Sequence, residues 1–165
     1  MGKILRLTLC AAAAWCLWSC NTSGCTDLRS AIPLAEFYSS AADKQISLDS
    51  LQISGIGAPG DSVMLAAGTA AQEVYLPMRS QQTSTSWCIS YKWEALDNPE
   101  WNDTLTFRYH AEPYFASSEC GAMYIYHLEG LDYTTHLIDS IAVLDSVITN
   151  IDAAQLRIYF NTADE

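Results

Sequence analysis

The sequence predicts an all-β domain built as a two-layer antiparallel β-sandwich, with a small β-barrel as the alternative. From Ile32 onward, short runs rich in β-branched and aromatic residues alternate with clusters of Gly, Pro, Asp, Asn and Ser. Helical periodicity is scarce there, and the runs have the length and spacing of strands. Many short strands at this spacing are typical of sandwiches of the immunoglobulin or transthyretin type. The chain length suits one such domain with a single core.

The apolar runs place the strands along this domain. We expect them at residues 32–38, 45–54, 61–67, 72–77, 85–94, 103–111, 122–129, 137–149 and 155–160. Two of these segments, Leu48–Leu51 and Ile138–Ile141, carry Asp-Ser between apolar residues three positions apart, which interrupts the alternation. Such a step requires a bulge or a tight bend, and we expect one at each place.

The clearest pair of strands joins residues 85–94 to residues 103–111. One face of each strand is apolar, with Trp87, Ile89, Tyr91 and Trp93 on the first and Leu105, Phe107 and Tyr109 on the second. Because side chains alternate across a strand, both faces should point to one core, and Cys88 should lie on the outer face. The connecting residues 96–102 are rich in turn formers, which predicts an antiparallel hairpin.

The N-terminus has the pattern of a secretory signal peptide over residues 1–19. Lys3 and Arg6 precede an apolar run from Leu7 to Trp18, shorter than the roughly 20 residues that a spanning helix needs. The following Ser19-Cys20 step, after Leu17-Trp18, resembles the lipobox of bacterial lipoproteins, in which the cysteine is acylated and becomes the new N-terminus. We expect lipid on Cys20 to anchor the protein to the membrane. The alternative is an ordinary cleaved signal peptide.

Residues 20–30 are then a short polar tether, and residues 31–165 form the single domain. The formal charge of the whole chain is −11, and the mature part is more acidic still because Lys3 and Arg6 leave with the signal. This acidity argues against nucleic acid as a partner. No cofactor motif is present, so none is expected.

Three cysteines remain after Cys20, and three thiols cannot all pair within one chain. An exported protein meets an oxidising compartment, so one disulfide is expected. We predict Cys25 with Cys120, because both lie outside the strongest strand patterns. Cys88 is then the odd thiol, either accessible on the outer face of its strand or covered by a loop.

No set of residues predicts catalysis or a metal site. Acids such as Asp97, Glu100, Glu112 and Glu119 could serve glycoside hydrolysis only if two of them flanked a cleft. His110, His127 and His136 lack the spacing that places two ligands on one metal. The loop 97–103 offers oxygen donors that Ca²⁺ accepts, but without the EF-hand register, which favours a solvated turn.

Alternation leaves Trp101 as the one exposed aromatic candidate for binding a sugar ring or a peptide, since the other aromatics of the hairpin face the core. A second pattern is Asp, then Ser or Thr, then an apolar residue. It occurs five times where composition predicts about one, with Ser50, Ser62, Thr104, Ser140 and Ser146 as the central residues. The triplet is similar to the O-glycosylation acceptor motif of exported Bacteroidota proteins. It is equally explained by the preference for Asp-Ser in turns and at strand entries.

Several segments together resemble a family of small Bacteroidota lipoproteins, the domain of unknown function 6452. They are the Cys20 lipobox, the nearby Cys25, Val74–Met78, Asp103–Tyr109 and Ser118–Gly121. The resemblance covers most of the mature chain and implies an envelope lipoprotein, but it supplies no catalytic residues.

We therefore expect a non-enzymatic cell-envelope module that binds a protein or glycan partner, or plays an accessory role in an outer-membrane assembly. The alternatives are a glycan-processing hydrolase that uses surface carboxylates and a structural spacer. No acidic cluster of the kind associated with surface export follows Cys20, which favours an outer-membrane position facing the periplasm.

Overall fold

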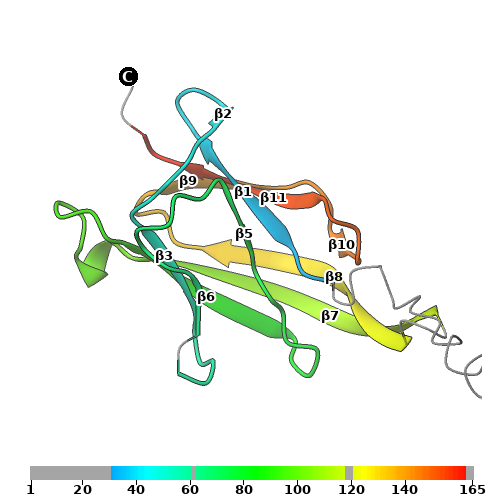
Figure 1. The fold of residues 1–165 in the computed structure, drawn as a ribbon. Helices are drawn as coiled ribbons and strands as arrows, with labels where there is room; N and C mark the ends of the chain where they lie inside the picture. Colours follow the sequence, from blue (N-terminus) through cyan, green and yellow to red (C-terminus); the bar gives the residue numbers. More distant parts are fainter. Residues whose placement is uncertain (1–30, 61, 118–120, 163–165) are drawn as a thin grey trace, which may run out of the picture.

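The computed structural model describes residues 31–60, 62–117 and 121–162. Within them the fold is all-β, with one short 3₁₀ helix, η1 (Pro99–Trp101). The strands are β1 (Leu34–Ser39), β2 (Lys44–Gln45), β3 (Leu51–Gly55), β4 (Val63–Leu65), β5 (Glu73–Tyr75), β6 (Ser84–Tyr91), β7 (Asp103–Ser117), β8 (Gly121–Tyr133), β9 (Ile138–Val143), β10 (Val147–Ile148) and β11 (Ala154–Phe160). Figure 1 shows them as two layers.

The first sheet has the order β2-β1-β11-β9, with β5 also paired to β1. Its central pair, β1 and β11, is parallel, whereas its other pairs are antiparallel. This parallel pair joins the first and last strands of the described domain. The second sheet has the order β10-β8-β7-β6-β3-β4 and is antiparallel throughout. The all-β, two-sheet architecture agrees with the fold class predicted from the sequence, except that β1 and β11 pair in parallel where only antiparallel pairs were predicted.

Two expected strands are each divided in two, because the chain changes sheets within them. The segment 45–54 becomes β2 in the first sheet and β3 in the second, separated by a single bridge from Leu48 to Ala71. The segment 137–149 becomes β9 in the first sheet and β10 in the second.

The expected irregularities lie where the two Asp-Ser steps occur. Asp49 and Ser50 form the bend before β3. At Asp139 the register of β9 against β11 shifts, since Tyr159 pairs with Ser140 and Phe160 with Ile138. The interrupted alternation in the sequence therefore marked one bend and one β-bulge.

The core lies between the two sheets and is rich in aromatic side chains. Trp87 stacks edge-on against Phe107 with ring centroids 4.8 Å apart, and Phe37 does the same against Phe160 at 5.7 Å. The inward face of β6 and β7 is as predicted, because Trp87, Ile89, Tyr91, Leu105, Phe107 and Tyr109 are all buried.

Trp93 is the exception on that face. It was expected in the core, but its side chain is 48% exposed. The strand β6 ends at Tyr91 and the chain then turns, with the Leu96 and Asp97 amides donating to the Trp93 carbonyl. Side chains alternate between the two faces only within a strand, so the rule no longer directs the Trp93 side chain into the core.

Among the described residues, no helix has the length and apolar character to cross a bilayer.

Candidate functional site

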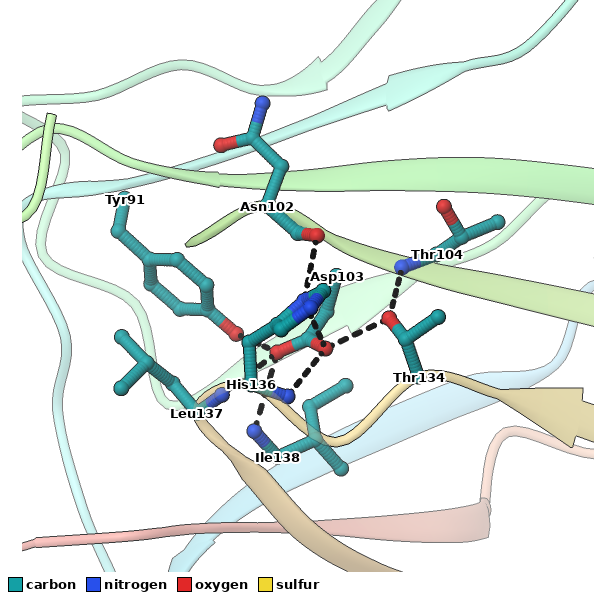
Figure 2. Close-up of polar contacts among 8 residues, drawn as sticks. All are labelled: Tyr91, Asn102, Asp103, Thr104, Thr134, His136, Leu137 and Ile138. Carbon is teal, nitrogen blue, oxygen red and sulfur yellow. Dashed lines mark hydrogen bonds and ion pairs between the residues drawn. The ribbon is translucent and has the colours of Figure 1, made fainter. Parts of the chain in front are cut away.

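One buried carboxylate joins the two sheets at one end of the sandwich. Asp103 begins β7, and its side chain is fully buried. Its carboxylate accepts hydrogen bonds from the Tyr91 hydroxyl at 2.7 Å and the Thr134 hydroxyl at 2.6 Å. It also accepts three backbone N–H groups, those of His136, Leu137 and Ile138, at 2.8, 2.9 and 3.1 Å. Figure 2 shows these groups converging on Asp103 from the second sheet and from the segment that leads into β9.

The Asp103 carboxylate is ionised because its partners are all donors. Burial alone would raise the pKa of Asp103, but the hydrogen bonds from Thr134, from the backbone of His136 and Leu137 and from Tyr91 outweigh burial and hold that pKa below its ordinary value. Burial, together with the hydrogen bond to Asp103, raises the pKa of Tyr91, which therefore stays protonated as a donor. The exposed His136 ring lies against this site, with Nδ1 3.4 Å from the Asp103 carboxylate and donating to the Asn102 carbonyl at 3.0 Å.

Above Tyr91 lies a cleft of about 880 Å³. Segments far apart in the sequence form it: the β1–β2 turn, residues 46–51, the end of β6 with the turn that follows, Leu137, and the end of β11. Its apolar lining consists of Ala41, Ala42, Ile46, Leu48, Leu51, Tyr91, Trp93, Leu96, Leu137 and Phe160. Apart from Lys44, its other lining residues are uncharged and polar: Ser39, Gln45, Ser47, Ser50, Asn161 and Thr162. Asp103 lies behind this lining and holds both Tyr91 and Leu137 in place.

The charge of the cleft differs from that of the chain. No Asp or Glu is among its lining residues, and Lys44 is the one charged side chain there. The other Lys and Arg side chains that the structure describes all have partners: Lys92 with Asp97, Arg108 with Asp132, Arg157 with Glu36, and Arg79 with Gln82 and the Ile56 carbonyl. Lys44 is exposed and has no partner within the described residues. The cleft thus combines a largely apolar lining with one unpaired cation.

The tryptophan at the cleft is not the one that the sequence singled out. Trp101 is 45% exposed, as predicted, but it lies on η1 and does not line the cleft. Trp93 does line it. The turn formers after Trp93 were the only signal in the sequence that could have placed it outside the core.

The acids offered for catalysis are not brought together. Asp97 is exposed and pairs with Lys92 at 2.8 Å, and Glu100 is exposed on η1. Glu112 lies much further along β7, where it contacts His127. Glu119 lies outside the described residues. Of the described acids, none lines the cleft.

The calcium hypothesis for residues 97–103 fails at Asp103, because five protein donors already occupy its carboxylate. In the part of the chain that the structure describes, no three His, Cys, Asp or Glu side chains gather in a way that could hold a metal. His110 and His127 do meet across β7 and β8, stacked at 4.6 Å, and their ring nitrogens contact Glu129 and Glu112.

Cys20, Cys25 and Cys120, the cysteines of the lipidation and disulfide predictions, lie outside the described residues. Cys88 lies on the outer face of β6, half-buried and not in a disulfide, with Sγ 3.6 Å from the Ser90 hydroxyl. Both predictions for the other cysteines therefore stay predictions.

The five hydroxyls of the Asp-Ser/Thr triplets are dispersed over the domain. Ser146 is exposed, and Ser50, Ser62, Thr104 and Ser140 are half-buried. Ser50 and Ser140 each donate to the preceding aspartate, at 3.1 and 2.9 Å, and Asp145 accepts the Val147 amide at 2.8 Å. These local contacts are those of turns and strand entries. Glycosylation of the five hydroxyls stays a prediction.

Comparison with known proteins gives one match. The model of a family of unknown function, DUF6452, matches residues 50–160. No curated protein and no solved structure matches the chain. The family match begins after β1 and β2. It includes Asp103 and Tyr91 but fewer than half of the residues that line the cleft, and Lys44 lies before it. Since the match spans well over half of the sequence, this chain belongs to the family DUF6452, whose function is unknown.

Proposed function

We propose that this protein is an exported, lipid-anchored module of the bacterial envelope that binds a small amphipathic anion in the cleft above Tyr91. The observation that carries the proposal is the contrast between the cleft and the rest of the domain. An acidic protein keeps one cation unpaired beside a largely apolar cavity that no carboxylate lines. A ligand with an apolar body and a single carboxylate or phosphate would complement both features.

The size and build of the cleft support a small-molecule ligand. Its volume of about 880 Å³ falls within the range of roughly 300–1,000 Å³ that is common for ligand pockets. An alkyl chain that entered the cleft would gain about 0.8 kcal/mol for each CH₂ removed from water. Lys44 is exposed, so its charge would add a modest amount and would mainly set the orientation of the anionic end. The chemistry is that of binding, with no reacting group required.

Dodecanoate is a suitable probe, and Trp93 is a built-in reporter. We expect dodecanoate to change the tryptophan emission of the protein, and we expect Trp93→Phe to abolish that change because Trp93 lines the cleft. Trp101→Phe is the matched control, since Trp101 is equally exposed but lies outside the cleft.

Lys44→Ala should weaken dodecanoate binding about three- to tenfold in a calorimetric titration and leave dodecanol binding unchanged. Lys92→Ala, which removes a lysine outside the cleft, should have no effect. Absence of dodecanoate binding, or equal losses with both lysine variants, would contradict the proposal.

The lipid anchor is tested separately, in cells of the native host grown with labelled palmitate. We expect the wild-type protein and Cys88→Ala to incorporate the label and to fractionate with the outer membrane. Cys20→Ala should incorporate none, because the acylated thiol is missing. A wild-type protein that carries no label would contradict the anchor and leave the binding proposal standing.

A further inference from the structure

The β7–β8 ribbon extends beyond the rest of the sandwich and ends in exposed aromatic side chains. Figure 1 shows both strands reaching past the first sheet on the side away from β2 and the end of β11. Near the far end of the ribbon, Tyr114 is 50% exposed, Phe115 67% and Tyr124 38%. Three large aromatic residues exposed to water at one end of a small domain form an apolar surface of the kind that marks a binding site for a protein or a membrane.

The register explains why these side chains are uncovered. Pro113 pairs with Tyr124 and Phe115 with Ala122, so these four residues share one face. That face continues the one on which Tyr109 and Tyr126 are buried in the core. Past the end of the first sheet the face is left largely open, and core-type residues continue into solvent. Tyr114 lies on the other face, so aromatic surface is present on both sides of the ribbon.

The same end of the domain receives the chain from the predicted anchor. Ala31 and Ile32, the first described residues, line a small pocket together with Ala122, Met123, Tyr124 and Tyr126. The tether from Cys20 to Ala31 is short, and even fully extended it spans only about 35–40 Å. The acyl chains on Cys20 would therefore hold this end of the domain, and not the cleft end, within reach of the bilayer.

We propose that the aromatic end of the β7–β8 ribbon, formed by Tyr114, Phe115 and Tyr124, docks on the lipid bilayer to which Cys20 is anchored. This inference rests on the lipid anchor of the proposed function. Tyr side chains favour the headgroup level because their ring is apolar and their hydroxyl polar, and Phe115 inserts deeper. Glu112 and Glu129 lie on the ribbon itself, in β7 and β8, and the domain is acidic, so the matching surface is a zwitterionic bilayer and not an anionic one.

Docking fixes the orientation of the protein. β7 contains 15 residues, roughly 45–50 Å of extended chain, with Asp103 beneath the cleft at one end and the aromatic residues near the other. A bilayer at the aromatic end leaves the cleft facing away from the membrane. The lipid anchor then keeps the domain close to the bilayer, and the aromatic end of the ribbon fixes the orientation of the domain on it.

Phe115→Trp provides the test, in lipidated mature protein reconstituted into phosphatidylcholine vesicles that contain bromine-labelled acyl chains. We expect the bromines to quench the emission added by the introduced indole about twofold or more, because that ring would lie in the bilayer interface. Val63→Trp is the matched control. Val63 is 51% exposed on β4, the opposite edge strand of the same sheet from β8 and β10, and the emission added there should be unquenched. The native Trp93 and Trp101 should likewise be unaffected.

Equal emission from Phe115→Trp with and without brominated lipid, in protein whose mass includes the acyl chains, would overturn docking and leave the anchor intact. A protein without acyl mass would overturn both. A blue shift in the emission of the Phe115→Trp variant that rises with protein concentration in the absence of lipid would identify a second copy as the occupant and would also overturn the proposal.

Discussion

Replacing Asp103 with Ala is expected to lower the free energy of unfolding by about 3–5 kcal/mol. The side chain is fully buried and accepts five hydrogen bonds, three of them from the backbone just before and at the start of β9. Its removal leaves those N–H groups and the Tyr91 hydroxyl without their acceptor. The second sheet would lose its attachment to the first at this end, and the cleft wall would lose its support.

Asp103→Asn should cost nearly as much, although it keeps the volume of the side chain. An amide presents an NH₂ group where the carboxylate presented an oxygen, and every neighbour of Asp103 is a donor. Tyr91→Phe, by contrast, removes one donor and leaves the charge satisfied by the remaining four, so it should cost about 1–2 kcal/mol. Chemical denaturation followed by fluorescence measures all three changes.

The pH dependence distinguishes a charge effect from a packing effect. The pKa of Asp103 is lower in the folded protein than in the unfolded chain, where it is about 3.9. The contribution of the Asp103 charge to the free energy of unfolding is therefore complete above about pH 3.9 and is lost as the pH falls through the folded pKa. The difference in unfolding free energy between the wild type and Asp103→Ala should therefore narrow below about pH 4. A difference that stays constant down to the acid limit of folding, or an Asp103→Asn variant as stable as the wild type, would contradict this account.

The sequence predicts the sandwich well because the fold depends on local alternation. The pattern of Trp87, Ile89 and Tyr91 opposite Leu105, Phe107 and Tyr109 is visible without any knowledge of the partner sheet. The same rule placed Trp93 in the core, because alternation does not say where a strand ends. Within residues 45–54 and 137–149 the chain passes from one sheet to the other, but the sequence predicted only a bend or bulge in each segment. The sheet that a strand joins depends on its pairing with strands distant in the sequence.

The candidate site was not predictable in the same way. Asp103 appeared as one of several acids in a turn, and its partners come from Tyr91 and from residues more than thirty positions later. Three of those partners are backbone amides, which leave no trace in the side-chain pattern. The cleft is likewise assembled from segments distant in sequence, and the unpaired state of Lys44 follows only from where the carboxylates lie in three dimensions.

The second large effect concerns the predicted disulfide between Cys25 and Cys120. We expect Cys25→Ser, Cys120→Ser and the double variant each to lower the free energy of unfolding of the oxidised protein by about 4–5 kcal/mol, as the chain-entropy account gives for a loop of this length. The three losses should be equal, because one bridge is lost in each case. Cys88→Ser should change the stability little, since Cys88 is half-buried on the outer face of β6 and is not in a disulfide.

The described parts of the chain make this pairing geometrically accessible. Ala31 and Ala122 line the same small pocket, and Cys25 and Cys120 are each only a few residues away along the chain. Six residues of extended chain span about 20 Å, so the tether can return to the end of the ribbon and meet the separation of about 3.8 Å between Cβ atoms that a disulfide needs. The bridge would hold the anchored segment against the aromatic surface, which would shorten the effective tether and restrict the orientations open to the domain.

Peptide mass mapping without reductant identifies the bridge, and urea denaturation with and without dithiothreitol measures its contribution. A bridge that contains Cys88 would contradict the pairing, as would single serine variants as stable as the oxidised wild type. If the pairing holds, dithiothreitol should also weaken the quenching of the Phe115→Trp variant by brominated lipid, because the reduced tether allows the domain to turn away from the bilayer. Stability and orientation would then both depend on one bond between the anchor segment and the ribbon.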